Sequence, residues 1–323
     1  MQAARLHAES LVVDAHCDTV LRMIRSDFAL GEEHPDGHID LPRLKRGGVD
    51  LQFFALYIEP QFKPDRSAKR VLQLLDAFYR EQAANADALS VALSVSDIKE
   101  ARQQGKVAAL LSIEGGEALE GDLGVLRMMH RLGVRAIGLT WNQRNEIADG
   151  VGEKSAGGGL TDFGRQVVTE MNRLGMIVDV SHLSERSFWD CIETSRQPII
   201  ASHSNAKALC GHVRNLTDDQ IVALAKNGGV MGINLSSEFL VQEGQASIAD
   251  VVRHIDHICA LVGPEHVGLG ADFDGIKEPP FGLMDVSQFP ALTEALVEHG
   301  FDEIFIKGFL GGNFMRVIET VIG

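Results

Sequence analysis

The chain has 323 residues, of which 45% are hydrophobic, and its formal net charge at pH 7 is -15. This length allows a large core, and the negative charge argues against nucleic-acid backbones and anionic membrane surfaces as partners. We interpret the acidity as a source of solubility. The four cysteines are widely spaced and form no C-x-x-C pair, which predicts a reducing compartment; they are Cys17, Cys191, Cys210 and Cys259.

The first ten residues lack the basic stretch and apolar core of a signal peptide, and no apolar run is long enough to cross a bilayer. We therefore expect a cytoplasmic protein without a nucleic-acid or membrane partner. No linker divides the sequence, so we expect one domain over residues 1–323. We also expect a homo-oligomer, namely a dimer.

Eight apolar runs alternate along the chain with longer stretches of helical character. The runs occupy residues 11–18, 49–58, 107–116, 134–141, 176–182, 198–204, 229–235 and 266–275. Near-continuous apolar runs are typical of parallel strands that are covered on both faces. The polar connection 19–48 predicts a loop with short helices near the mouth of a barrel.

Three of the intervening stretches carry clear helix boundaries. Each begins with an N-cap residue and ends in glycine, as in 161–175, 217–229 and 247–263. Eight strands in such an alternation favour an α/β fold of the (β/α)8 TIM-barrel type over an open doubly wound sheet. No G-x-G-x-x-G sequence follows the first run, which removes support for a dinucleotide-binding fold.

Polar residues close most of these apolar runs, at the ends where active sites of such barrels lie. They are His16, Asp18, Glu114, His182, His203, Asp272 and Asp274. His16 and Asp18 alternate onto one face of a strand, with Cys17 on the other. Singly, each could cap a helix or form a loop hydrogen bond. Together, histidines and carboxylates at one mouth call for a cation, and nitrogen and oxygen ligands suit zinc and similar divalent ions.

The remaining histidines and the cysteines predict structural roles. His254 and His257 have helical i,i+3 spacing but lie far from the strand ends, so we interpret them as part of a surface face. The segment 32–40 could hold a metal in a loop, but a solvated loop is the preferred interpretation. The cysteines are expected in the core.

Over essentially its whole length, the chain resembles the membrane (renal) dipeptidase family, peptidase family M19, of the amidohydrolase superfamily. The blocks that carry the resemblance, in the family's order, are "DAHCDT", "SIEGG", "DVSHLSERSFWD", "ASHSNAKAL", "HVRNLTDDQI", "GLGADFDG" and "GGNFMRV".

The resemblance implies a site with two divalent metal ions, zinc by preference. It makes His16 and Asp18 ligands of one metal, Glu114 the bridge, and His182 and His203 ligands of the other. It further implies that Arg214 holds the substrate's carboxylate, for which a guanidinium fork is well shaped. Asp272 matches the acid/base, in preference to Asp274. Without the resemblance, Arg214 could equally be a surface arginine.

One position departs from the family pattern. The mammalian members carry a substrate-binding histidine where this chain has Trp141, whose indole donates a hydrogen bond but carries no charge. We expect Trp141 and Asn142 to contact the substrate, and Arg144 or Asn145 are further candidates to compensate. The change bears on substrate range and rate.

These observations lead to the hypothesis of a zinc-dependent dipeptidase in which the two metals activate a bridging hydroxide and Asp272 transfers the proton. The substrate would be a small molecule, a dipeptide. One alternative is a related metal-dependent hydrolase of another small amide or a lactone. The other is a barrel that binds peptides without turnover.

Overall fold

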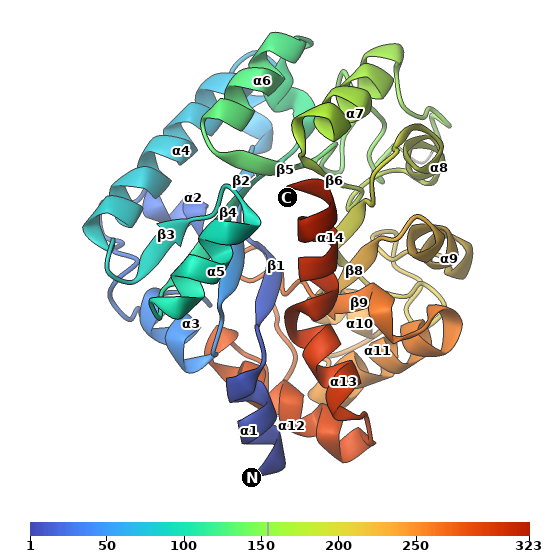
Figure 1. The fold of residues 1–323 in the computed structure, drawn as a ribbon. Coiled ribbons are helices and arrows are strands. Elements are labelled where there is room, and N and C mark those ends of the chain that lie inside the picture. Colours follow the sequence, from blue (N-terminus) through green and yellow to red (C-terminus); the bar gives the residue numbers. More distant parts are fainter. Residues whose placement is uncertain (154) are drawn as a thin grey trace.

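A computed structural model describes residues 1–153 and 155–323, and it confirms the (β/α)8 barrel (Figure 1). Eight parallel strands form a closed ring in which β2 pairs with β1 on one side and with β4 on the other. The ring consists of β1 (Val13–Cys17), β2 (Leu51–Tyr57), β4 (Val107–Glu114), β5 (Val134–Gly138), β6 (Ile177–Asp179), β7 (Ile200–Ser204), β8 (Val230–Ile233) and β9 (Val267–Leu269). All eight predicted runs contain one of these strands.

A ninth strand, β3 (Leu89–Val91), was not predicted. It pairs in parallel with the first residues of β4, whereas β5 pairs with β4 only from Leu111 onward. The two strands thus share one edge of β4, and β3 lies outside the ring. Two of its three residues are half-buried and one of them is a serine, so the strand gives no near-continuous apolar run in the sequence.

Apart from α14, which lies across the ring, the helices are arranged around it (Figure 1). They are α1 (Gln2–Glu9), α2 (Val20–Met23), α3 (Leu41–Arg46), α4 (Ser67–Ala84), α5 (Val95–Gln103), α6 (Leu123–Arg131), α7 (Asp162–Leu174), α8 (Glu185–Thr194), α9 (Asp218–Lys226), α10 (Ser237–Leu240), α11 (Ile248–Val262), α12 (Phe289–His299), α13 (Glu303–Lys307) and α14 (Asn313–Val321). The expected N-caps precede α7, α9 and α11, and the side chains of Thr161 and Thr217 accept the capping hydrogen bonds. None of the described helices is long and apolar enough to span a bilayer.

The end of the barrel at which the strands begin, called the lower end below, is filled by apolar side chains. The end at which the strands finish is called the upper end. The last helix, α14, crosses the lower end (Figure 1) and packs against the interior of the ring. Its Phe314 is 1% exposed, and the ring centroid lies 6.3 Å from that of Phe53 in β2. Buried aromatic and aliphatic side chains contribute most of the packing energy of a core, so α14 serves as a plug.

The expectation that His254 belongs to a surface face was wrong. His254 in α11 is fully buried, where its ring accepts a hydrogen bond from the backbone of Ala206 and donates one to the carbonyl of Leu240. The segment 32–40 is an exposed loop over most of its length, as expected, but its end is anchored. Asp40 is buried as the N-cap of α3, and the ring of His38 accepts a hydrogen bond from the backbone of Asp274 at the mouth.

Candidate metal centre

The upper end of the barrel brings together six side chains that the sequence analysis singled out. All six are 9% exposed or less, and they come from the ends of five strands: His16, Asp18, Glu114, His182, His203 and Asp272. Their ligand-type atoms form two overlapping groups that share His16, one with Glu114 and His203, the other with Asp18 and Asp272. The juxtaposition that the strand ends predicted is therefore present.

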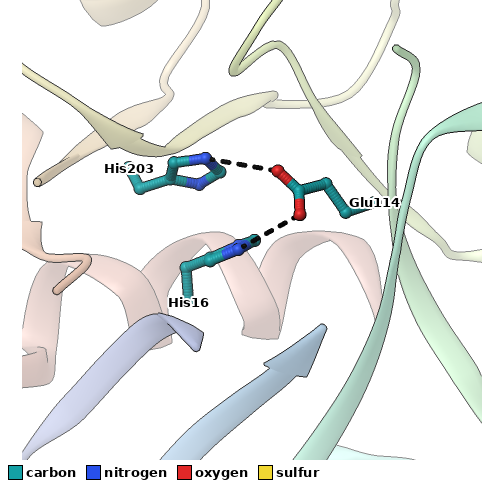
Figure 2. Close-up of side chains that lie close together, drawn as sticks. All are labelled: His16, Glu114 and His203. Carbon is teal, nitrogen blue, oxygen red and sulfur yellow. Dashed lines mark ion pairs between the residues drawn. The ribbon is translucent and has the colours of Figure 1, made fainter. Parts of the chain in front are cut away.

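Glu114 lies between His16 on one side and His203 on the other (Figure 2). Its Oε2 is 3.6 Å from His16 Nε2, while its Oε1 is 3.0 Å from His182 Nε2 and 3.7 Å from His203 Nε2. One oxygen of this carboxylate faces His16, and the other faces His182 and His203. This is the geometry of a bridging ligand.

The atoms around His16 are too far apart for hydrogen bonds and suitably spaced for a shared ion. His16 Nε2 lies 3.7 Å from Asp18 Oδ2 and 3.8 Å from Asp272 Oδ1, and it is buried without a hydrogen-bond partner among the described residues. Ligands bound at about 2.1 Å in tetrahedral geometry lie about 3.4 Å from one another. An unpaired buried nitrogen is costly, and a cation at this place would satisfy it.

Hydrogen bonds fix the tautomers of the other two histidines. His182 Nδ1 lies 2.8 Å from Asn142 Oδ1, which can only accept, so the proton is on Nδ1. Ser202 donates its hydroxyl proton to Asp179, so its Oγ accepts from His203 Nδ1 at 2.7 Å.

Both Nε2 atoms therefore present lone pairs. They lie 2.9 Å apart and face the Glu114 carboxylate, an arrangement that is repulsive without a cation. The donor chemistry thus fits a divalent metal, and the sequence analysis had overlooked Asp179 and Ser202 as supports of His203.

Burial and mutual charge shift the pKa values of the cluster in opposite directions. Burial raises the pKa of Asp18 to about 6 and that of Asp272 to about 7. Burial lowers the pKa of His182 to about 3, with a further contribution from the charge of Arg214. Burial alone would raise the pKa of Glu114, but His16 and His182 hold it far below its usual range. Such divergent values are typical of functional sites.

The backbone at the mouth is strained where it delivers the functional side chains. His182 and Asp272 have φ angles of 68° and 62°, in the left-handed region that non-glycine residues seldom adopt. Gly275 is required beside them, because a Cβ there would lie 2.1 Å from Asp18 Oδ2 and 2.6 Å from Asp272 Oδ1. The loop after β9 thus packs directly against the cluster.

The two aspartates of this loop have different surroundings. Asp272 reaches the cluster with Oδ1, and its Oδ2 accepts a hydrogen bond of 2.8 Å from Asn234, a residue that the sequence analysis missed. Asp274 instead accepts hydrogen bonds from the Thr19 hydroxyl and the His38 backbone, both at 2.7 Å. Asp274 therefore ties the 19–48 connection to the mouth and does not face the cluster.

Arg214 is 4% exposed and has no carboxylate partner among the residues of the described chain. Its Nη2 donates to the carbonyl of His203 at 2.9 Å, and its buried Nε has no hydrogen-bond partner within residues 1–153 and 155–323. Burial lowers its pKa, but arginine remains protonated in proteins. A buried cation with a free donor beside the cluster is suited to bind an anionic group of a ligand.

A cavity of about 570 Å³ lies over the cluster, with Trp141 and Asn142 in its wall. The Trp141 ring packs edge-on against Tyr57 at 5.3 Å and tilts over His182 at 6.1 Å, so it forms an aromatic wall. The side-chain carbonyl of Asn142 is engaged by His182, which makes this residue a support of a ligand histidine.

The two further candidates to compensate for Trp141 are bound elsewhere. Arg144 forms an ion pair with Asp149, and the amide of Asn145 donates to Glu117 and to the carbonyl of Leu139. Neither is directed by these contacts toward the cluster. The cation near Trp141 is instead Lys63, whose Nζ lies 5.2 Å from the ring centroid and pairs with Glu117.

A (β/α)8 barrel that gathers histidines and carboxylates at the carboxyl ends of its strands is the arrangement of a metal-dependent hydrolase. Comparison with known proteins identifies the family within this class. Residues 1–322 match the model of the membrane dipeptidase family, peptidase family M19, and the chain belongs to this family.

Individual relatives agree with this assignment. The chain is 39% identical to dipeptidase aclJ of Aspergillus oryzae over 88% of the chain and 70% of that protein. It is 35% identical to dipeptidase 3 of Mus musculus over 99% of the chain but only 66% of the mouse protein. A metallopeptidase structure from Rhodobacter sphaeroides, with a phosphinate mimic of L-Ala-D-Ala, superposes with a TM-score of 0.91 at 31% identity, covering 97% and 100% of the two chains.

Proposed function

We propose that the protein hydrolyses dipeptides with the help of two zinc ions. The observation that carries this proposal is the position of the unpaired, buried Arg214 beside a cluster whose lone pairs converge. A metal centre cleaves an amide, and a fixed guanidinium next to it selects a substrate that ends in a carboxylate. The relatives named above support the same reaction class.

Five side chains would hold the metals, with Glu114 shared between them: His16, Asp18, Glu114, His182 and His203. When bound, two divalent ions supply Lewis-acid activation of a water molecule and of the scissile carbonyl. Asn142 and Ser202 keep the Nδ1 protons of their histidines in place, so that the Nε2 lone pairs remain available.

Asp272 has the position and the support of a proton carrier. Its Oδ1 faces the cluster, while the Asn234 amide fixes its Oδ2. It would take a proton from the attacking water and deliver it to the amine that leaves. Arg214 would hold the C-terminal carboxylate and thereby fix the distance from that carboxylate to the bond that is cleaved.

The grip of Arg214 is tested by comparing a dipeptide with its C-terminal amide. We expect the metal-loaded enzyme to prefer the free carboxylate by about 10²-fold or more in kcat/KM, because the amide leaves the buried charge unpaired. Arg214→Met keeps the apolar stem and removes the fork, so the preference should collapse. If the variant keeps the same preference, Arg214 does not bind the C-terminal carboxylate, and the main argument for a dipeptidase is lost.

Trp141 motivates a second candidate function, hydrolysis of another small amide or a lactone by the same centre. An aromatic wall without a charge at this place changes the contacts available to the substrate. A panel of dipeptides, N-acyl amino acids and lactones, measured with the zinc-loaded protein, separates the two candidates. Faster turnover of a lactone than of every dipeptide would favour the second.

A further inference from the structure

An ion pair near the metal-type cluster joins three loops at the upper end of the barrel. Lys63 follows β2, Glu117 follows β4 and Asn145 follows β5, and these three strands are neighbours in the ring. Lys63 Nζ pairs with Glu117 Oε1, and the Asn145 amide donates to Glu117 Oε2 at 2.9 Å. Glu117 is thus the shared partner of the other two loops, three residues after the carboxylate of Glu114.

This ion pair is withdrawn from solvent. The side chain of Glu117 is 5% exposed and that of Lys63 is 15% exposed. Charges that leave water lose much of their mutual attraction to the cost of desolvation, so a buried pair is weak evidence for stability. A role in fixing the geometry of the three loops accounts for the pair better than a gain in stability does.

The lysine of the pair lies over the aromatic wall of the cavity. Its Nζ is 5.2 Å from the ring centroid of Trp141 and 5.8 Å from that of Tyr57, and these two rings meet edge-on at 5.3 Å. A cation at such a distance is attracted to the face of an aromatic ring. Lys63 therefore restrains both rings, while Glu117 holds the charged end of the lysine.

The charges of the pair favour a positional role over an electrostatic one. Glu117 neutralises Lys63, and neither residue is among those that line the cavity over the cluster. The pair therefore does not supply a charge at the place of Trp141. Its influence on a bound substrate passes through the Trp141 ring, which does line the cavity and tilts over His182 at 6.1 Å.

Building on the dipeptidase function proposed above, we propose that Lys63 and Glu117 are positioning residues that hold Trp141 in place as the wall of the substrate cavity. Lys63 restrains the ring, and Glu117 ties Lys63 to the loop after β4. Because the ring is ordered in advance, the substrate does not have to order it on binding. The pair thus lowers KM and has little effect on kcat.

Trp141 itself reports on this restraint without any assay of activity. The chain contains two tryptophans, so Trp189→Phe leaves Trp141 as the only one, and quenching of its fluorescence by acrylamide measures how freely the ring moves. In this background, Lys63→Met removes the cation and Glu117→Gln removes its partner but keeps an oxygen for Asn145. We expect both to increase the quenching constant, and Lys63→Arg, which keeps a cation over the ring, to retain the original value.

Kinetics on the metal-loaded proteins test the same restraint through the substrate, L-Ala-Ala with the second residue in the configuration that wild type cleaves faster. Lys63→Met and Glu117→Gln should raise KM about tenfold and change kcat by less than about threefold, while Lys63→Arg restores KM. The double variant Lys63→Met/Glu117→Gln should match the single ones, and it leaves no unpaired buried charge that could unfold the protein. Lys99→Met, on a side chain that is 61% exposed, is the control and should change neither value.

A last comparison shows whether the pair acts through the ring. In a Trp141→Ala background, Lys63→Met should raise KM no further, because the group that it positions is absent. An equal rise with and without the ring, or a quenching constant that is the same in every variant, overturns the proposal. If metal-loaded wild type cleaves no dipeptide, the proposed function fails, and the quenching constants still decide whether the pair holds Trp141.

Discussion

The two ends of the barrel are built from the same strands but serve opposite purposes. At the lower end, α14 fills the ring with apolar side chains, and Phe314 is almost completely buried. At the upper end, the strands deliver histidines and carboxylates among which His16 Nε2 and Asp18 Oδ1 are buried without a hydrogen-bond partner in the described chain, and the backbone is strained at His182 and Asp272.

This difference shows where the stability and the chemistry of the molecule reside. Packing at the lower end lowers the free energy of the folded state, whereas the upper end holds groups that repel one another until a ligand binds. Substitutions at the lower end should therefore reduce stability and leave the chemistry intact. Substitutions at the upper end should do the reverse.

The largest effect is expected for Glu114→Gln at the upper end. The amide keeps the shape but loses the charge between the two histidine groups, so kcat should fall on the order of 10³-fold or more and metal content should drop below two ions per chain. Elemental analysis and initial rates measure both. Glu100→Gln, on the exposed side of α5, is the matched control and should change neither. Full metal content with full activity in Glu114→Gln would contradict the bridge.

At the lower end, Phe314→Ala should reduce the free energy of unfolding by about 3–5 kcal/mol, because a large buried ring leaves a cavity. Urea denaturation measures the loss, and kcat below the melting transition should stay near the wild-type value. Phe281→Ala is the control, since this ring is 74% exposed and its removal should cost less than about 0.5 kcal/mol. Equal losses for the two phenylalanines would show that α14 is not a plug.

Asp272→Asn tests the proton carrier at the upper end. The side chain keeps its size but can no longer accept the proton, so kcat should fall on the order of 10²-fold or more while metal content is retained. Single-turnover kinetics on the metal-loaded variant give the chemical step directly. Near wild-type turnover would mean that another group carries the proton.

The smallest effect is the pH dependence of metal binding. Burial raises the pKa of Asp18 to about 6 and of Asp272 to about 7, so the metal-free cluster holds protons below these values. Metal binding must displace the proton of the ligand Asp18, and the charge of the metal disfavours that of the neighbouring Asp272, so the apparent affinity should rise with pH from 5.5 to 7, by up to about tenfold per unit for each proton released. Calorimetry in buffers of different ionisation enthalpy counts the protons. An affinity that is constant over this range would contradict the shifts.

The order and number of the ring strands could be predicted because each is an apolar run that alternates with a stretch of helical character. The helix boundaries at Thr161 and Thr217 were equally visible, since a capping side chain and a terminal glycine are local signals. β3 and the burial of His254 were not predictable in this way. Both depend on partners distant in the sequence, namely the edge of β4 and the Ala206 and Leu240 backbone.

The membership of the cluster could be predicted from the strand ends, but its supports could not. Asp179 and Asn234 lie within the apolar runs 176–182 and 229–235, yet nothing in the sequence shows that they hold Ser202 and Asp272. The different roles of Asp272 and Asp274 depend on left-handed backbone angles that direct two aspartates, two positions apart, to different neighbours. Periodicity alone assigns them to the same face.

The plug formed by α14 also constrains how the protein is synthesised. Residues 313–321 are translated after every strand of the ring, and β9, which pairs with β1, only shortly before them. Until then, the apolar interior of the barrel is not covered by α14, and the ring is not closed by the pairing of β1 with β9. Exposed apolar surface of this kind promotes aggregation and recruits chaperones. The nascent protein should therefore depend on chaperones until its last helix emerges, even though the helix lies at the end of the barrel away from the chemistry.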